Sequence, residues 1–236
     1  MSRRGLPKQY VGPLTPAQAA AGIEAAARTA QGLLRDAKLL FENQRWERAT
    51  ALAILAIEES GKTAILRQIL IAANSMELKM AWRSYRTHTE KNVSWIFPDV
   101  VSRGGTKLED FRPIFDAQSN HRWLLEAVKQ KCLYSNVSSK PEWSSPDQEI
   151  TAELAKTVVT AASILVRDGP IAMSSEPELK LWVNHLRPVW NGPVGDMMKA
   201  LSACYAEADA AGVLQGTGTA AEMLDFLYQE STSLKQ

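Results

Sequence analysis

Apolar residues at helical spacing run through most of this chain and constrain its fold more than any other feature. The first such segment covers residues 16–41, and Thr15 and Gln18 form a predicted capping box at its start. A second long segment covers residues 46–73. Further helices are expected at 75–91, 121–133, 149–166, 178–190, 193–211 and 219–230. No segment shows the alternation of a strand, so the sequence predicts an all-α fold.

Irregular connections divide the predicted helices. Residues 92–120 and 134–147 have no clear period and are rich in residues that favour turns. We therefore expect a helical bundle with additional C-terminal helices. Its predicted parts are a flexible N-terminal arm, a helical domain and a C-terminal helical extension packed on the same core, with bounds of 1–14, 15–170 and 171–236.

Two of the predicted helices have less regular apolar faces. The helix at 75–91 is expected to use Ser75 as its N-cap. Its apolar contacts are predicted to be Met76, Met80 and either Trp82 or Tyr85. The helix at 121–133 is expected to pack through Trp123, Leu124, Val128 and Leu133.

The small net charge excludes no class of binding partner, but the charged residues are distributed unevenly along the chain. The formal net charge of the 236 residues is +1, and 45% of them are hydrophobic, as in soluble globular proteins. Residues 62–91 contain six Lys or Arg and two Glu, and residues 193–236 contain two Lys and six Asp or Glu. This pattern fits either a basic binding face or the docking of domains or of a dimer.

Composition also bears on compartment and cofactors. The two cysteines give neither a disulfide framework nor a metal-ligand spacing. No signal-peptide pattern follows the basic start, and no apolar run reaches the length of a bilayer span. We expect a cytoplasmic protein without a membrane segment. The scattered histidines and cysteines predict no metal site, and no glycine-rich nucleotide loop predicts a cofactor.

The first candidate site lies at the end of a nearly all-apolar helical stretch. Glu58 and Glu59 are adjacent, so their side chains lie about 100° apart on a helix and one of them can face the interior. Lys62 follows Glu58 by four residues, the favourable order for an ion pair on a solvated helix face. The apolar residues before the two glutamates favour a partly buried carboxylate with a partner.

The second candidate site combines arginines, a histidine and a lysine. A histidine can act as acid or base near neutral pH, and arginine can stabilise a charged phosphate; a metal-independent ribonuclease needs both. Arg83 and His88 lie about 140° apart on an ideal helix, so they converge only if the helix bends or ends between them, or across a dimer seam. Arg86 and Lys91 are further candidates beside His88. The alternative is a capping or surface histidine.

These segments, together with a third one, resemble the AbiV family of abortive infection proteins in the HEPN superfamily. The resemblance covers residues 33–161. The residues that carry it are Leu39 to Glu42, Trp46, Ala49, Leu52 to Lys62, Trp82, Tyr85 to Lys91, Lys131 to Tyr134 and Trp143 to Pro146.

The resemblance implies a HEPN-like helical bundle over residues 15–170, frequent formation of a homodimer and a role in bacterial defence against phage. Active HEPN proteins cleave RNA without metal through an Arg-x4–6-His motif, typically with the motifs of two protomers facing each other. Arg83 and His88 have this spacing.

The leading hypothesis is therefore a HEPN-type RNA endonuclease that arrests growth or translation. His88 would be the general acid and base, and Arg83 and Arg86 would stabilise the phosphate. A supporting polar site would comprise Glu58, Glu59, Lys62 and Lys91. The alternative is a non-catalytic helical module that binds a phage or host protein and blocks translation through that contact. Nucleotide sensing in the same polar cleft is a third option, and a phage-encoded activator is a possible partner.

Overall fold

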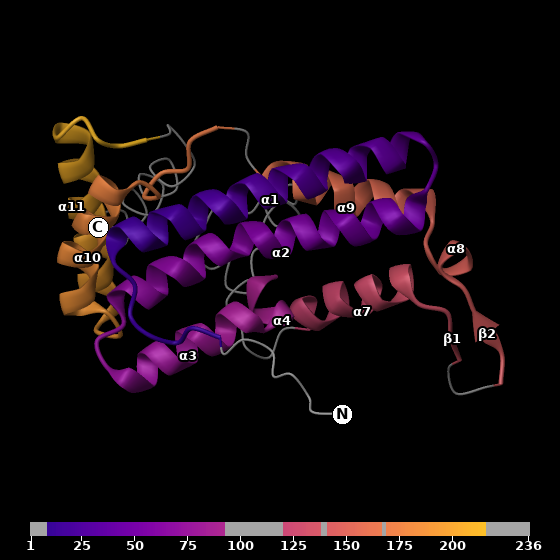
Figure 1. The fold of residues 1–236 in the computed structure, drawn as a ribbon, viewed down its shortest axis with the longest axis horizontal. Coiled ribbons are helices and arrows are strands. Elements are labelled where there is room, and N and C mark those ends of the chain that lie inside the picture. Colours follow the sequence, from indigo (N-terminus) through magenta and orange to yellow (C-terminus); the bar gives the residue numbers. More distant parts are fainter. Residues whose placement is uncertain (1–8, 93–119, 138–140, 167–168, 216–236) are drawn as a thin grey trace, which may run out of the picture.

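Two long antiparallel helices form the centre of the molecule (Figure 1). The structure is a computed structural model, and it describes residues 9–92, 120–137, 141–166 and 169–215. Helix α1 covers Pro16–Glu42 and helix α2 covers Trp46–Ile71. The prediction of an all-α fold is confirmed. Among the described residues, the strands are two short ones, β1 (Asn136–Val137) and β2 (Trp143–Ser144), which pair antiparallel.

Helix α1 begins where the sequence predicts it to begin. The Thr15 hydroxyl accepts from the backbone N–H of Gln18, and the Gln18 side chain accepts from the backbone N–H of Thr15. Along its buried face, α1 presents four alanines besides Ile23 and Leu34. Small side chains on this face let α2 approach closely, and the two helices share a hydrophobic core.

Helix α2 is the hub of the bundle. It buries residues on most of its circumference, because α9 packs beside it together with α1, while α3, α4 and α7 follow its other side (Figure 1). These helices are α3 (Ser75–Arg86), α4 (His88–Lys91), α7 (His121–Leu133) and α9 (Ala152–Leu165). The short helix α8 (Pro146–Glu149) follows the β1–β2 hairpin.

Helix α3 differs from its prediction at both ends. Asn74, not Ser75, is the N-cap, since its side-chain oxygen accepts from the backbone N–H groups of Met76 and Glu77 at 3.0 Å each. The expected continuous helix to Lys91 is interrupted at Thr87, which is extended with φ −92° and ψ 122°. The helix therefore ends between the predicted arginine and histidine positions.

The apolar faces of α3 and α7 also differ from the predictions. Trp82 is buried and Tyr85 is half-buried, as expected, but Met76 and Met80 are exposed. On α7, Trp123, Leu124 and Leu133 are exposed as well. The buried side of α7 is formed instead by Leu125, Lys129 and Cys132.

The C-terminal helices cross the end of the α1–α2 pair (Figure 1). They are α10 (Glu176–Leu186), the short 3-10 helix η2 (Arg187–Val189) and α11 (Val194–Ala210). Leu179 of α10 packs with Ile23 and Leu66 in one hydrophobic cluster. Helix α10 therefore shares this cluster with α1 and α2. The domain boundary near residue 170 is not tested by this contact and stays a prediction.

Other predicted segments fall partly outside the described residues. Of the predicted arm, residues 9–14 are described and contact α3: the Trp82 indole N–H donates to the Gly12 carbonyl at 2.9 Å. The first eight residues, most of the connection at 92–120 and the predicted helix at 219–230 lie outside the described part. None of the helices in the described ranges has the length and apolar character that a membrane crossing requires.

Candidate functional site

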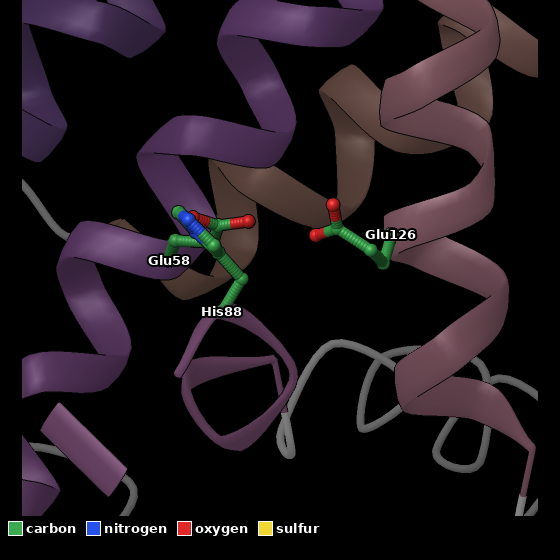
Figure 2. Close-up of side chains that lie close together, drawn as sticks. All are labelled: Glu58, His88 and Glu126. Carbon is green, nitrogen blue, oxygen red and sulfur yellow. The ribbon is translucent and has the colours of Figure 1, made fainter. Parts of the chain in front are cut away.

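His88 and Glu58 form the centre of the candidate site. Glu58 lies on α2 and is 2% exposed, while His88 begins α4. The imidazole Nδ1 lies 2.6 Å from the Glu58 Oε2 atom, and the His88 side chain is 54% exposed. Figure 2 shows both side chains pointing toward each other from their separate helices, with Glu126 of α7 facing them. The buried carboxylate thus fixes one ring nitrogen of a histidine whose ring reaches the solvent.

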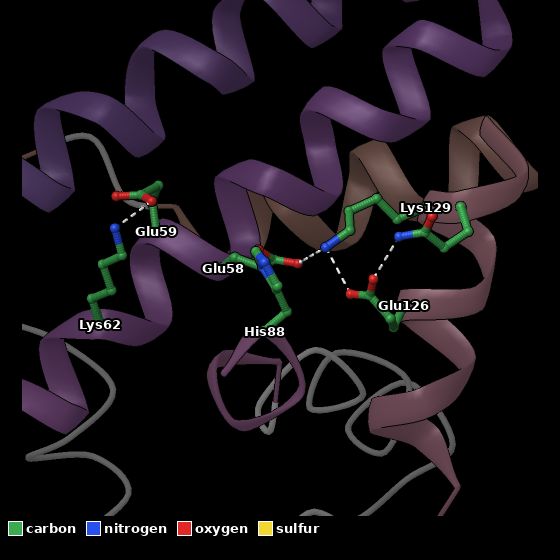
Figure 3. A network of polar contacts seen from close by, with 7 residues as sticks. Glu58, Glu59, Lys62, His88, Glu126 and Lys129 are labelled. Carbon is green, nitrogen blue, oxygen red and sulfur yellow. Dashed lines mark hydrogen bonds and ion pairs between the residues drawn. The ribbon is translucent and has the colours of Figure 1, made fainter. Parts of the chain in front are cut away.

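Lys129 of α7 connects Glu58 with Glu126. Its ammonium lies 2.6 Å from Glu58 Oε1 and 2.7 Å from Glu126 Oε2 (Figure 3). The other Glu126 oxygen accepts from the Gln130 side chain at 2.8 Å. Burial works to lower the pKa of Lys129, but its hydrogen bonds with Glu126 and Glu58 outweigh burial and raise that pKa. Lys129 therefore stays charged and compensates both carboxylates.

The position of α4 depends on a glycine of α2. A Cβ atom at Gly61 would lie 2.1 Å from the Lys91 carbonyl oxygen, closer than any real Cβ contact. Only glycine lets the α4 backbone rest on α2 at this point. The Glu-Glu-Ser-Gly-Lys segment thus supplies both the carboxylate that binds His88 and the surface that supports its helix.

The two arginines of the predicted motif lie apart from the Glu58 network. Arg83 is exposed on α3, and its side chain has no hydrogen bond or ion pair with any described residue. Arg86 donates to the Tyr10 carbonyl at 2.8 Å and lies over the Trp82 ring at 5.5 Å. The break at Thr87 separates α3 from α4, yet within one chain it brings neither arginine into contact with His88.

Glu59 and Lys62 form a pair of their own. Their side-chain atoms are 2.5 Å apart, and the pair lies to one side of Glu58 in Figure 3. The Lys62 ammonium also lies over the Tyr85 ring at 5.3 Å, which links α2 with α3. The surface ion pair that the spacing of Glu58 and Lys62 would allow does not form. Lys62 pairs with Glu59, and the buried Glu58 pairs with Lys129.

Lys91 does not join this network either. It is 8% exposed, and its ammonium has no hydrogen bond or ion pair with the residues that the structure describes. Burial lowers its pKa, although the charge of Glu58 acts in the opposite direction. Lys91 lines a separate cavity beside α2.

Three residues of the site could in principle ligate a metal. Glu58, His88 and Glu126 each offer a ligand atom, and these atoms lie within 4.8 Å of one another. The Lys129 ammonium already contacts both carboxylates, so the positive charge that they require comes from the protein itself. A divalent cation would have to displace this lysine.

Lys129 and Glu126 are the site residues that sequence reasoning misses. The available signal was the spacing of Leu125, Lys129 and Cys132, which repeats at four and three residues and forms the buried stripe of α7. A lysine inside a buried stripe requires a partner of opposite charge. The choice of Trp123 and Leu124 as the apolar face concealed this signal.

The described helices form an all-α bundle around α2, and a histidine and a buried carboxylate meet across two of them, as expected for a HEPN-like fold. The family model HEPN_AbiV, described as AbiV, matches residues 18–167. This chain therefore belongs to the AbiV family of HEPN-type abortive-infection proteins, as its sequence motifs predict. No curated protein and no solved structure matches it.

Proposed function

We propose that this protein is a metal-independent endoribonuclease of phage defence and that His88 is its general acid and base. The observation that carries the proposal is the contact between His88 Nδ1 and the buried Glu58 carboxylate. In the tautomer with the proton on Nδ1, this N–H group donates a hydrogen bond to Glu58. The Nε2 atom can then accept a proton from a substrate. The exposure of the imidazole gives RNA access to that nitrogen.

The proposed reaction needs one proton transfer at each end of the scissile bond. His88 takes the proton of a ribose 2′-hydroxyl, and the 2′-oxygen attacks the adjacent phosphorus. The bond to the 5′-oxygen breaks, and this oxygen leaves with a proton from an imidazolium. The products are a cyclic 2′,3′-phosphate and a 5′-hydroxyl. Glu58 stabilises the imidazolium that forms during the first transfer.

Arg83 is the proposed source of charge for the phosphate. It is exposed and free of ion pairs among the described residues, so it can bind a phosphate without losing another partner. Since Arg83 and His88 of one chain are not in contact, the proposed active form is a homodimer in which each His88 meets an arginine of the second copy. Arg86 supports α3 through Tyr10 and Trp82.

The experiment is RNA cleavage in EDTA by the purified protein and by two histidine variants. His88→Ala removes the proposed acid and base. His185→Ala is the matched control, because His185 also lies 2.6 Å from a carboxylate, that of Glu207, but on the C-terminal helices. We expect cleavage by the wild type and by His185→Ala, and a loss of about 10²–10⁴-fold in His88→Ala. A 2′-deoxy substitution at the cleaved position should block the reaction.

Three results would contradict the proposal. Equal cleavage by wild type and His88→Ala would remove His88 from the chemistry. Cleavage that EDTA abolishes and Mn²⁺ restores would replace it with a metal reaction at Glu58, His88 and Glu126. If no variant cleaves RNA while both histidine variants still arrest growth, the protein acts as the alternative, a helical module that binds a phage or host protein.

A further inference from the structure

Glu58 divides its two carboxylate oxygens between two nitrogen partners. Its Oε2 atom lies 2.6 Å from Nδ1 of His88, and its Oε1 atom lies 2.6 Å from the Lys129 ammonium. Glu58 is 2% exposed and Lys129 is 4% exposed, so little water screens their charges. A buried carboxylate requires a positive counter-ion, and Lys129 supplies one. His88 is then not needed as an imidazolium to compensate Glu58.

Glu126 adds a second carboxylate to the same cluster. Its Oε2 atom lies 2.7 Å from the Lys129 ammonium, and its carboxylate lies within 4.8 Å of the ligand atoms of Glu58 and His88 (Figure 3). The two carboxylates and the lysine have a formal charge of −1. Without the lysine this charge would be −2, and without the charge of Glu126 it would be zero. A more negative cluster favours a proton on the imidazole, so Lys129 and Glu126 act on His88 with opposite signs.

Other charged side chains also lie on the helices around His88. On α7, His121 begins the helix two turns before Lys129. Glu59 and Lys62 of α2 bind each other, and the charge of Lys91 on α4 interacts with that of Glu58. Arg83 and Arg86 on α3 and Glu90 on α4 complete the charged set of these two helices near the histidine. Because these groups stay the same when only Lys129 or Glu126 is changed, they cannot account for opposite effects of the two changes.

We propose that Lys129 is a positioning residue of the active site, which acts on His88 through Glu58. It holds one carboxylate oxygen, so that the other is directed at Nδ1, and it serves as the counter-ion, so that His88 can stay neutral. An imidazolium carries a proton on both nitrogens and cannot take the proton of a 2′-hydroxyl. Glu126 holds the ammonium from its other side. The inference rests on the proposed function, since it concerns the same histidine.

The experiment measures the protonation of each histidine by NMR titration of the full-length protein without RNA. Lys129→Met should raise the pH at which half of His88 is protonated by about one unit or more, because the cluster becomes more negative. Glu126→Gln should lower this midpoint, because the cluster becomes neutral. His185 is the internal control: it lies 2.6 Å from a Glu207 oxygen on the C-terminal helices, and its midpoint should not change in either variant.

A further variant keeps the test decisive if Lys129→Met does not fold. In the Glu126→Gln background, Lys129→Met leaves a single buried carboxylate, which an imidazolium at His88 can compensate. This change should again raise the His88 midpoint by about one unit relative to Glu126→Gln alone. The proposal is wrong if neither Lys129→Met variant moves the midpoint, or if Glu126→Gln raises it.

Cleavage assays give the second readout. The kcat/KM of Lys129→Met should fall near pH 7 and recover at higher pH, where His88 loses its extra proton. A purely structural role of Lys129 would lower the rate equally at every pH and would overturn the proposal. The two proposals can fail separately, because the titration contains no RNA. Midpoints that move as expected in a protein that cleaves no RNA would contradict the ribonuclease and support the role of Lys129 in the charge of His88.

Discussion

Two buried glutamates of this protein, Glu58 and Glu178, have opposite kinds of partners. Glu58 is 2% exposed and binds the side chains of His88 and Lys129, which come from α4 and α7. Glu178 is 0% exposed, and its partners are backbone N–H groups of residues 173–175 and Gln215, together with the Ser175 hydroxyl. The partners of one carboxylate are side chains from two other helices, and the partners of the other are mostly backbone groups.

This difference in partners indicates different roles: Glu58 positions another side chain, whereas Glu178 stabilises the fold. Burial would raise the pKa of Glu178, but hydrogen bonds from the backbone of Gln215, from both groups of Ser175 and from the backbone of Met173 outweigh it and lower that pKa. These donors hold residues 173–175 and the segment that follows α11 onto α10, and both oxygens of the carboxylate are occupied by them. At Glu58, by contrast, one partner is an exposed imidazole that can exchange protons. Burial of a carboxylate alone therefore does not mark a functional site; the nature of its partners does.

The largest predicted effect is on catalysis. Glu58→Gln keeps the shape of the side chain but removes the charge that holds His88, so we expect RNA cleavage to fall by about 10²–10⁴-fold. Glu178→Gln should cleave at the wild-type rate at temperatures where it is folded. Single-turnover cleavage in EDTA measures both rates, and circular dichroism verifies the fold. Equal rates for Glu58→Gln and wild type would break the comparison.

The second prediction concerns the free energy of unfolding, which Glu178→Gln should lower more than Glu58→Gln does. Glu178→Gln replaces a charged acceptor of several buried donors by an amide that repels some of them, so unfolding should become easier by about 3 kcal/mol. Chemical denaturation measures this change. A Glu178→Gln protein as stable as the wild type would show that the backbone donors find other partners.

The third prediction concerns the support of His88 rather than its charge. Gly61→Ala should destabilise the protein by about 1–3 kcal/mol and lower cleavage, because the new Cβ atom would collide with the Lys91 carbonyl and push α4 away from α2. Gly32→Ala in α1 is the matched control. Its nearest atom would be the Arg35 guanidinium at 3.9 Å, so this change should stabilise the protein by about 0.5–1 kcal/mol. Opposite signs in denaturation curves would confirm the close approach.

The smallest predicted effect is a pH dependence. A carboxyl whose folded pKa is lowered stabilises the protein above its unfolded pKa, here 4.5, and this contribution is lost as the pH falls through the folded value. The stability gap between wild type and Glu178→Gln should therefore be largest near neutral pH and shrink below about pH 4.5, by no more than about 1.4 kcal/mol per pH unit. Denaturation at several pH values measures the gap; a constant gap would contradict the prediction.

Local signals in the sequence predicted much of the fold. The start of α1 follows from Thr15 and Gln18, because a capping box involves only residues of one turn. The end of α3 could not be predicted in this way. Thr87 is neither glycine nor proline, and the break there accompanies the docking of α4 onto Gly61, a contact between residues distant in sequence.

The same limit, that local patterns do not describe contacts between distant residues, explains why only part of the candidate site was predicted. The nearly all-apolar stretch before Glu58 indicated that one of two adjacent glutamates would be buried, and Glu58 is that residue. Which side chains would meet it depends on the packing of α4 and α7, which no local pattern describes. His88 was therefore expected near Glu58, whereas Lys129 was not, and Arg83 was placed closer to the site than it lies.

The exposure of Arg83 and His88 has a consequence for how such a family can change over time. Neither side chain belongs to the hydrophobic clusters of the bundle. A substitution at either position removes no core contact, so under the proposed function a single codon change could abolish or restore RNA cleavage without rebuilding the bundle.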